Sequence, residues 1–412
     1  MIDPRYRQHL DWIATQQQHM VFLTHAWASI NSGSYNLEGI RRFRRALEDN
    51  FRWLDGAMEV IPLAAITQVD SQGNEIIIEM AEALSIRKRP EAPIQVLLAG
   101  HMDTVYGPEH PFQQLTLLDE NTLNGPGVTD LKGGLVVMLK ALEAFEQFEG
   151  ASKVGWQIIL NPDEEIGSVA SDPVLKQAAL GKHLGLIYEP PMVDGSIVGA
   201  RKGTGNFSIT VRGKAAHAGR NPEEGRNAIV ACAEITSLLF ALNGKKPGLT
   251  LNPGKVEGGG ALNTVPDLAI IRFNIRTSTA EDEAWVLQEI QHIIERFHLQ
   301  NGFEAHLHGQ FTRQPKPLAP PNQAVLDMVL DCGKQLGLEI GVKPSGGCCD
   351  GNNLWKYGLP NVDTLGVRGA HIHSDKEIIY LDSLTERAQL SALLLMRLAS
   401  GDLSVASIPP KA

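Results

Sequence analysis

Hydrophobic residues recur at two different spacings along the N-terminal half of the chain. Between Leu37 and Leu54, apolar side chains follow one another at intervals of three and four residues, which is the period of an amphipathic helix. Asn36 stands directly before this segment and is a suitable N-cap. A second segment with helical spacing extends from Gly133 to Phe148. We therefore predict a helix over each segment.

Short apolar runs alternate with these helical segments and indicate strands. They lie at Glu75–Glu79, Ile94–Ala99, Gly155–Leu160 and Leu184–Tyr188. Short runs that are apolar throughout are typical of strands buried on both faces of a sheet. The alternation of strand and helix predicts an α/β fold, in which helices cover both faces of a mixed sheet.

The pattern changes after about Ala200. We predict, in order, a strand at Phe207–Val211, a helix at Asn227–Leu242, extended stretches at Leu249–Val256 and Leu268–Arg276, a helix around Val286–Phe297 and a strand around Phe303–Leu307. This βαββαβ order is that of a ferredoxin-like, split βαβ arrangement. We expect residues 201–310 to form a second domain, inserted into a discontinuous larger domain made of 1–200 and 311–412. The proline-rich segment "TRQPKPLAPPN" is the expected return linker.

Composition excludes several classes of function. Hydrophobic residues make up 43% and charged residues 20% of the 412 positions, as in ordinary globular proteins, and this length favours two or more domains. The net charge of −10 argues against nucleic acid or an anionic membrane as a partner. The polar first residues lack the apolar core of a signal peptide, and no run of about 18 apolar residues occurs. With four cysteines in no spaced framework, we expect a cytoplasmic protein.

Imidazole and carboxylate side chains follow the predicted strands or the glycine-rich turns after them. The candidates are His101, Asp130, the pair Glu164–Glu165, Glu189 and, near the C-terminus, His373. Open α/β sheets build their sites at the carboxyl edge of the strands, so we expect these side chains to meet there. Neutral imidazole and carboxylate are ligands for zinc near neutral pH. The set predicts a two-zinc hydrolase, because paired ions polarise a carbonyl and generate hydroxide.

The neighbours of these residues supply the remaining roles. Such a site also needs an unbound carboxylate that moves protons, and Glu164–Glu165 offers two carboxylates that must face differently. Asp103 lies two residues after His101 on the same side of a strand, where it can hold the other imidazole nitrogen. Alone, a Glu–Glu pair is usually solvated surface and a His-X-Asp sequence means little. These residues indicate a site because every one of these features follows a strand of one presumed sheet.

Five longer strings carry a resemblance to a known family. "GHMDTV", "GPGVTDLKGG", "DEEIGS", "GKAAHAG" and "HSDKEIIYLDSL" occur in this order between about Asn31 and Met396. Together they resemble the co-catalytic zinc metallopeptidases, a family that contains aminoacylase, acetylornithine deacetylase, succinyl-diaminopimelate desuccinylase and the bacterial glutamate carboxypeptidases. The sequence around "HSDK" is most similar to that of the glutamate carboxypeptidases.

The resemblance implies a role for each candidate ligand. Asp130 would bridge the two ions. His101 and Glu189 would complete one zinc, and Glu165 and His373 would complete the other. Cobalt or manganese would fit the same ligands.

The resemblance also implies the catalytic roles. Glu164 would be the general base, Asp103 would orient the first ligand histidine, and the peptide bond Asp130–Leu131 would be cis. His371 competes with His373 for the last ligand position. The family pattern places the ligand directly before "SDK", which favours His373.

The inserted domain serves in this family as a lid and as the dimer interface, so the resemblance implies a homodimer. His217, in "GKAAHAG", would reach the partner subunit's active site and help to stabilise the oxyanion. Taken without its surrounding string, His217 is a loop histidine with a local hydrogen bond. Asn263, in "GGGALNTVPD", would approach the substrate from the lid.

Substrate selection is expected to rest on fixed cations. Arg276 matches the position at which the glutamate carboxypeptidases bind the substrate's free carboxylate, a task that suits a planar guanidinium. The alternative for Arg276 is an exposed strand arginine. Arg313 would have a secondary role before the return linker, on a looser match. Arg201 and Lys202 could also face the site.

One departure from the family pattern concerns two adjacent thiols. In "SGGCCDGN", Cys348 and Cys349 stand where close relatives carry small hydroxyl residues. These thiols could line the pocket, act as soft metal ligands or oxidise, and packing is the interpretation we prefer. The substitution weakens any transfer of substrate specificity from the relatives.

The predicted function is a two-zinc metallohydrolase that cleaves an amide bond next to a free carboxylate, on a small peptide or an N-acyl amino acid. A glutamate carboxypeptidase is the nearest match. An N-deacylase of the acetylornithine or succinyl-diaminopimelate type is the first alternative. A non-catalytic binding protein on the same scaffold is the remote one.

Overall fold

The chain begins with three helices that the sequence places before the first sheet. The computed structural model describes residues 2–411, with the backbone alone for 298–301. The helices are α1 (Pro4–Thr15), α2 (Gln17–Ala28) and α3 (Leu37–Phe51). The side chain of Asn36 accepts a hydrogen bond from the Gly39 amide, so the predicted N-cap of α3 is confirmed. Within the described chain, no helix combines the length and apolar character that a membrane span requires.

Six strands form the main sheet, in the order β1–β4–β8–β5–β9–β16. Their bounds are β1 (Ala57–Ile61), β4 (Ala83–Lys88), β5 (Ile94–His101), β8 (Val154–Asn161), β9 (Leu184–Ile187) and β16 (Asn361–Val362). Strands β8, β5, β9 and β16 pair in parallel, whereas β1 and β4 join through antiparallel pairs. The sheet is therefore mixed, as predicted.

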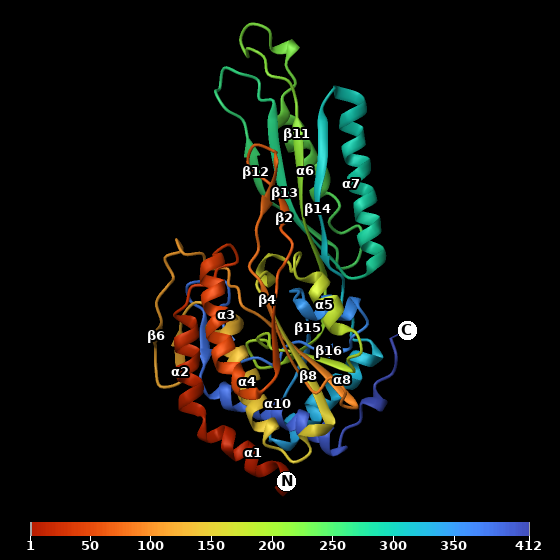
Figure 1. Cartoon of the computed structure of the whole chain (residues 1–412). Coiled ribbons are helices and arrows are strands. Elements are labelled where there is room, and N and C mark those ends of the chain that lie inside the picture. Colours follow the sequence, from red (N-terminus) through yellow and green to blue (C-terminus); the bar gives the residue numbers. More distant parts are fainter. Residues whose placement is uncertain (1, 412) are drawn as a thin grey trace.

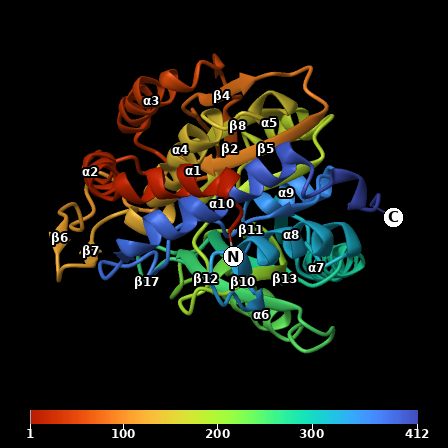
Figure 2. The same cartoon turned by 90° about the horizontal axis from the view of Figure 1, so that it is seen from below.

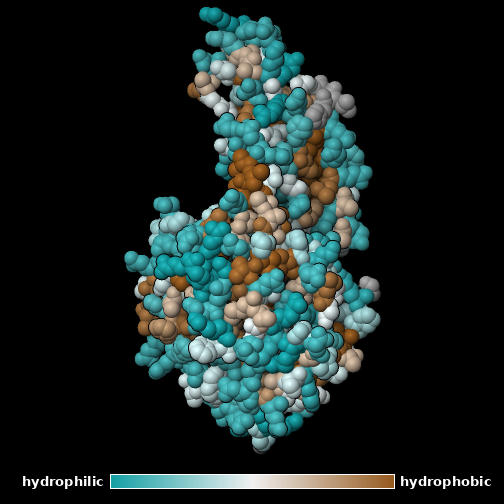
Figure 3. All heavy atoms as spheres, viewed as in Figure 1, coloured by the Kyte–Doolittle hydropathy of each residue, from teal (hydrophilic) through white to brown (hydrophobic). Residues whose placement is uncertain are grey.

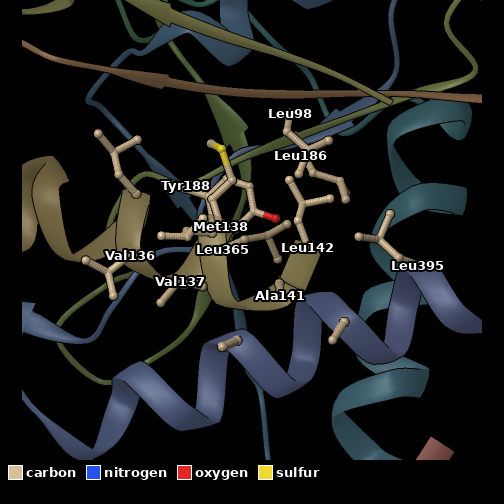
Figure 4. Packing of buried hydrophobic residues seen from close by; sticks show 14 of the residues in the cluster. Leu98, Val136, Val137, Met138, Ala141, Leu142, Leu186, Tyr188, Leu365 and Leu395 are labelled. Carbon is tan, nitrogen blue, oxygen red and sulfur yellow. The ribbon is translucent and has the colours of Figure 1, made fainter. Parts of the chain in front are cut away.

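Alternate residues of each strand pack on opposite faces of this sheet, as strand geometry requires. On one face, residues such as Leu98 and Leu186 join a core with α4 (Gly133–Glu146), α8 (Pro320–Gln335) and α10 (Asp382–Ser400). Figure 4 shows Met138 and Leu142 of α4 between the sheet and Leu395 of α10. Figure 2 shows α1 lying alongside α10 on this face.

The opposite face of the main sheet has its own, smaller core. There Leu97, Ala99 and Ile187 pack against α5 (Asp172–Ala179) and α9 (Asp350–Lys356). Helices therefore cover both faces, and the predicted α/β class is confirmed. Two minor sheets complete the body of the molecule. They consist of β10 (Ile197–Arg201) with β15 (Val342–Ser345), and of β6 (Thr116–Leu117), β7 (Thr122–Asn124), β17 (Gly369–Ala370) and β18 (Ile378–Tyr380).

A second unit stands on the body of the molecule (Figure 1). Its antiparallel sheet has the order β12–β13–β11–β14. The elements are β11 (Gly203–Arg212), α6 (Ala228–Phe240), β12 (Thr250–Gly258), β13 (Leu268–Thr277), α7 (Ala280–Asn301) and β14 (Glu304–Arg313). They follow the βαββαβ order, and their separate core contains only residues between Phe207 and Ala305. We call these elements the four-stranded unit.

One predicted strand lies elsewhere than expected. The run Glu75–Glu79 was assigned to the main sheet, but β3 (Glu75–Ile78) pairs only with β2 (Ile66–Val69) in a separate hairpin. The main sheet instead contains β1 and β4, which the pattern did not reveal. The prediction is wrong because an apolar run shows that a segment is extended, but not which strand it pairs with. Here Ile77 is 77% exposed.

A buried ion cluster ties the body to both crossings into the four-stranded unit. Asp363, fully buried after β16, accepts hydrogen bonds from Arg201 Nε at 2.8 Å and from Lys316 Nζ at 2.7 Å. Arg201 precedes β11 and Lys316 follows β14, and their backbones also pair with each other. Although burial opposes it, the two cations hold the pKa of Asp363 well below its usual value.

We expect Asp363→Asn to destabilise the protein by about 3–5 kcal/mol, because it leaves two buried cations uncompensated. The free energy of unfolding, measured by urea denaturation, should show this loss at neutral pH. Since the pKa of Asp363 is lowered on folding, its contribution is complete above the unfolded pKa of about 3.9 and disappears as the pH falls below it. The half-exposed pair Lys343–Asp194 supplies the control. Equal effects of Asp363→Asn and Asp194→Asn would contradict the assignment.

Candidate functional site

The candidate ligands gather where neighbouring strands of the main sheet end. His101 is the last residue of β5, and Glu189 follows β9. Glu164 and Glu165 lie in the short helical turn η4 (Glu164–Ile166), directly after β8. Because β8, β5 and β9 are adjacent and parallel, their carboxyl ends meet at one edge. The structure therefore brings these four side chains together.

Asp130 reaches the same place from a turn that leads into α4. It lies in η2 (Val128–Lys132), and its peptide bond to Leu131 is cis, as the resemblance implied. The carboxylate of Glu377 supports this turn from behind. It accepts hydrogen bonds from the amides of Gly127 at 3.1 Å, Thr129 at 2.9 Å and Asp130 at 3.1 Å. Glu377 is fully buried and was not predicted, although it lies within the string "HSDKE".

The two histidines approach Asp130 from opposite sides. His101 Nε2 lies 3.1 Å from Asp130 Oδ1, and His373 Nε2 lies 3.2 Å from Asp130 Oδ2. His373 Nε2 is also 3.1 Å from Glu165 Oε2, and His101 Nε2 is 3.8 Å from Glu189 Oε1. One carboxylate thus stands between two imidazoles, each with a further carboxylate beside it.

These groups form two overlapping sets of metal-capable ligands. In the first, His101, Asp130 and Glu165 bring their ligand atoms within 4.8 Å of one another. In the second, His101, Glu164 and Glu189 do the same. Imidazole nitrogen and carboxylate oxygen at such separations suit zinc and related divalent ions.

The charges of this cluster favour a bound cation. Burial raises the pKa of Glu164 to about 8, and it raises the pKa values of Glu165 and Glu189 as well. Hydrogen bonds to Asp130 and Glu165 raise the pKa of His373 to about 11. Ionisation of several carboxylates close together in a low-dielectric site is unfavourable. A bound cation lowers this electrostatic cost. The residues present therefore fit a metal centre.

Asp103 connects the first histidine with the Glu164–Glu165 turn. Its backbone oxygen lies 3.0 Å from His101 Nδ1, and its carboxylate accepts the amides of Glu164 and Glu165, each at 3.1 Å. The hydroxyl of Ser34 donates to it at 2.7 Å. Asp103 therefore contacts His101 through its backbone oxygen and fixes the turn that carries the two glutamates through its carboxylate.

Arg313 lies against Glu164 rather than free in the pocket. Its Nη2 donates to Glu164 Oε1 at 2.6 Å, to the Glu164 carbonyl oxygen at 2.9 Å and to Ser168 Oγ at 2.9 Å. Asp350 Oδ1 is 3.6 Å away. Because Arg313 is the last residue of β14, the four-stranded unit directly contacts the proposed base.

A cavity of about 540 Å³ opens beside the cluster and contains Arg276 on its wall. Of the three arginines that line it, Arg201 pairs with Asp363, and Arg313 pairs with Glu164. Arg276 has no acidic partner among the described residues. It donates to Asn274 Oδ1 at 2.9 Å, to the Gly346 carbonyl oxygen at 3.3 Å and to Cys348 Sγ at 3.2 Å.

The two thiols have different surroundings. Cys348 lines this cavity and donates to the Lys202 carbonyl oxygen at 2.9 Å. Cys349 is buried and caps α9, accepting a hydrogen bond from the Gly351 amide. Neither thiol belongs to the metal-capable groups found among the described residues.

His217 and Asn263 do not join the site within one chain. Both lie in exposed loops that join elements of the four-stranded unit, at its end remote from the body (Figure 1). The backbones of these two loops are linked, because the Ala218 amide donates to the Asn263 carbonyl oxygen. The His217 ring accepts a hydrogen bond from the Gly219 amide.

Comparisons with known proteins agree with this geometry. The profile of Peptidase family M20/M25/M40 matches residues 97–397. Carboxypeptidase G2 of Pseudomonas sp. (strain RS-16) is 27% identical over 315 residues, which cover 74% of each chain. Succinyl-diaminopimelate desuccinylase of Dechloromonas aromatica (strain RCB) is 26% identical over 380 residues, covering 84% of this chain and 98% of the relative.

A solved structure shows the same fold. An M20 family metallo-carboxypeptidase from Sulfolobus solfataricus superposes with a TM-score of 0.74 at 17% identity, covering 92% of this chain and 99% of that one. The family profile spans well over half of the sequence and includes every strand end that carries a candidate ligand. The chain therefore belongs to peptidase family M20/M25/M40 and is a metal-dependent peptidase or amidohydrolase.

Proposed function

We propose that the protein is a two-zinc hydrolase that cleaves an amide bond next to a free carboxylate, with a preference for C-terminal glutamate. The observation that carries the metal proposal is the position of Asp130 between His101 and His373, with Glu165 and Glu189 as outer carboxylates. The similarity to carboxypeptidase G2 favours the carboxypeptidase reaction.

Glu164 is the proposed proton carrier. When bound, the metal ions polarise the scissile carbonyl and make a water molecule nucleophilic near neutral pH. Glu164 takes a proton from this water and returns it to the leaving nitrogen, so that the amide becomes a carboxylic acid and an amine. Arg313 donates a hydrogen bond to Oε1 of Glu164, so Oε2 is the oxygen that would accept the proton.

Arg276 is the proposed binding site for the substrate's free carboxylate. Two of the three arginines in the cavity are already neutralised by acids, whereas Arg276 is held by neutral acceptors. A guanidinium that is positioned but not neutralised favours an incoming carboxylate. The substrate would then lie between Arg276 and the metal cluster.

We also propose a homodimer, because a single chain leaves His217 and Asn263 exposed and away from the cluster. Their loops share backbone hydrogen bonds, so they would move together towards a partner. Leu262, beside Asn263, is fully exposed. An oxyanion donor brought by the partner subunit would complete the site only when two chains associate.

The assay that tests the function uses C-terminal glutamate amides beside N-acetyl and N-succinyl amino acids. We expect zinc-loaded protein to hydrolyse the glutamate amides and Glu164→Ala to lower kcat by about 10²- to 10⁴-fold with its zinc retained. Turnover of N-acyl compounds alone would instead identify an N-deacylase, as the similarity to succinyl-diaminopimelate desuccinylase allows. Equal rates in the two proteins would refute Glu164 as the base.

Metal content distinguishes the two C-terminal histidines. His373→Ala should lose about one zinc per subunit, measured by elemental analysis after dialysis, since its ring contacts Asp130 and Glu165. His371→Ala should keep both ions, because the described contacts of His371 do not include those carboxylates. A full complement of zinc in His373→Ala would assign the ligand elsewhere.

A pair of substrates tests Arg276. We expect Arg276→Ala to lower kcat/KM by about 100-fold on a glutamate amide with free carboxylates, because the charge partner is lost. In wild type, conversion of the α-carboxylate to a carboxamide should cost a similar factor. That second loss should vanish in the variant, since the two changes remove one interaction. Independent, multiplying losses would show that Arg276 does not bind this carboxylate.

A further inference from the structure

A second and larger cavity adjoins the metal cluster, and Arg276 lines only the first of the two. Its volume is about 940 Å³, at the upper end of the range for sites that enclose a small molecule. It shares Glu165, Asn206, Asn274 and Thr312 with the first cavity. The two cavities are therefore neighbours that meet at the candidate ligand Glu165.

The β2–β3 hairpin forms one wall of this larger cavity, which we call the hairpin groove. At its base, Ile66 and Met80 pack with Ile166, Val169 and Ala170, which directly follow the ligand Glu165. At its tip, the hairpin contacts the four-stranded unit, where Arg272 donates to the Asp70 carbonyl oxygen at 3.0 Å. Figure 1 shows the hairpin rising from the body to this unit. The hairpin thus bridges both parts.

The two walls of the hairpin groove differ in polarity. The hairpin and the ligand turn supply much apolar lining, including Ala65, Ile166 and Val169, beside the polar Thr67 and Gln68. Figure 3 shows hydrophobic surface gathered where the four-stranded unit meets the body. The opposite wall is the sheet face that α6 and α7 leave uncovered. It presents Ser208, Asn252 and Gln310, whose side chains make no hydrogen bond with the described residues. Their donors and acceptors are available to a ligand.

The charges of the groove are already balanced. Lys255 and Arg272 both pair with Glu257, at 2.8 and 2.7 Å. Glu75 adds a second carboxylate, 3.4 Å from the His308 ring, which is charged only if protonated. Apart from the ligand Glu165, two cations thus face two carboxylates and their charges cancel. The groove suits an uncharged occupant, whereas the Arg276 side suits an anion.

We propose that the hairpin groove binds the acyl side of the substrate, and that it selects a bulky, uncharged acyl group with an apolar face and a hydrogen-bonding edge. An N-acylated aminoacyl residue has this chemistry, and acetyl and succinyl groups do not. The inference rests on the proposed function, because the scissile amide must lie at the metal cluster for its two sides to fall in the two cavities. Specificity would then depend on the hairpin.

Two tryptophan variants test the proposal from opposite walls. Gly254 lies on the wall of the four-stranded unit, and a Cβ there meets nothing closer than 3.8 Å, so Gly254→Trp introduces a large side chain at the groove without crowding at its Cβ. Thr67 is exposed on the hairpin wall, and Thr67→Trp fills it from the other side. Gly107 lies outside both cavities and has open space around it, so Gly107→Trp is the matched control.

The probes are N-acetyl-L-phenylalanyl-L-glutamate and N-acetyl-L-glutamate, which share the leaving amino acid. We expect wild type and Gly107→Trp to favour the dipeptide by at least about tenfold in kcat/KM, as apolar pockets discriminate. Gly254→Trp and Thr67→Trp should lose this preference, because their rates fall much more on the dipeptide than on N-acetyl-L-glutamate. A preference that is absent in wild type, or that survives in both variants, would overturn the proposal.

A binding measurement separates this proposal from the proposed function. The dissociation constants of both probes are measured by calorimetry on zinc-loaded protein in a Glu164→Gln background, so that binding is read without turnover. If wild type hydrolyses neither probe, the proposed function fails for glutamate amides. The dissociation constants then still test whether the hairpin groove binds the larger acyl group. Tighter binding of the dipeptide by about tenfold, lost in the tryptophan variants, supports the groove. Equal binding of the two probes refutes it.

Discussion

The crowding of carboxylates at one edge of the main sheet is the constraint on which the rest of the site depends. Asp103, Asp130, Glu164 and Glu189 are all buried there, and buried like charges are costly unless each is paired or hydrogen-bonded. The surrounding structure supplies that compensation: backbone amides for Asp103, imidazoles for Asp130 and the guanidinium of Arg313 for Glu164. A divalent cation is the remaining charge that this arrangement needs.

The same compensation couples the four-stranded unit to the chemistry. Arg313 ends β14 and holds the proposed base, while Arg201 and Lys316, on either side of the unit, are fixed by the buried Asp363. A displacement of the unit relative to the body would therefore disturb the ion pair at Glu164. The Arg313–Glu164 ion pair fixes both the position of the unit and the orientation of the proposed base. A lid movement would therefore act directly on the proton carrier.

The sequence predicted that the candidate ligands would meet because their position follows from the simplest regularity of the fold. A buried strand ends where its apolar run ends, and adjacent parallel strands end at one edge, so His101, Glu164 and Glu189 could be placed without knowing the strand order. Arg313 and Glu377 could not be placed in this way. Each acts through a partner more than 100 residues away. The spacing of apolar residues along a helix or strand gives no information about such a distant pairing. The hairpin was misassigned for the same reason, since its exposed apolar run resembles a core strand.

The proposed metal ligands would determine which bond is broken, but they do not explain which substrate is chosen. Their geometry belongs to the main sheet, and the family profile spans it as a whole. Selection requires groups that differ at the two ends of the cleft. Arg276 provides an unneutralised cation at one end, and the hairpin groove provides balanced charges and free amides at the other. Since both ends lie on the four-stranded unit, one sheet face would contact both halves of the proposed substrate. Specificity could therefore change through β12, β13 and the hairpin while the ligands stay fixed, because none of these elements contains a proposed metal ligand.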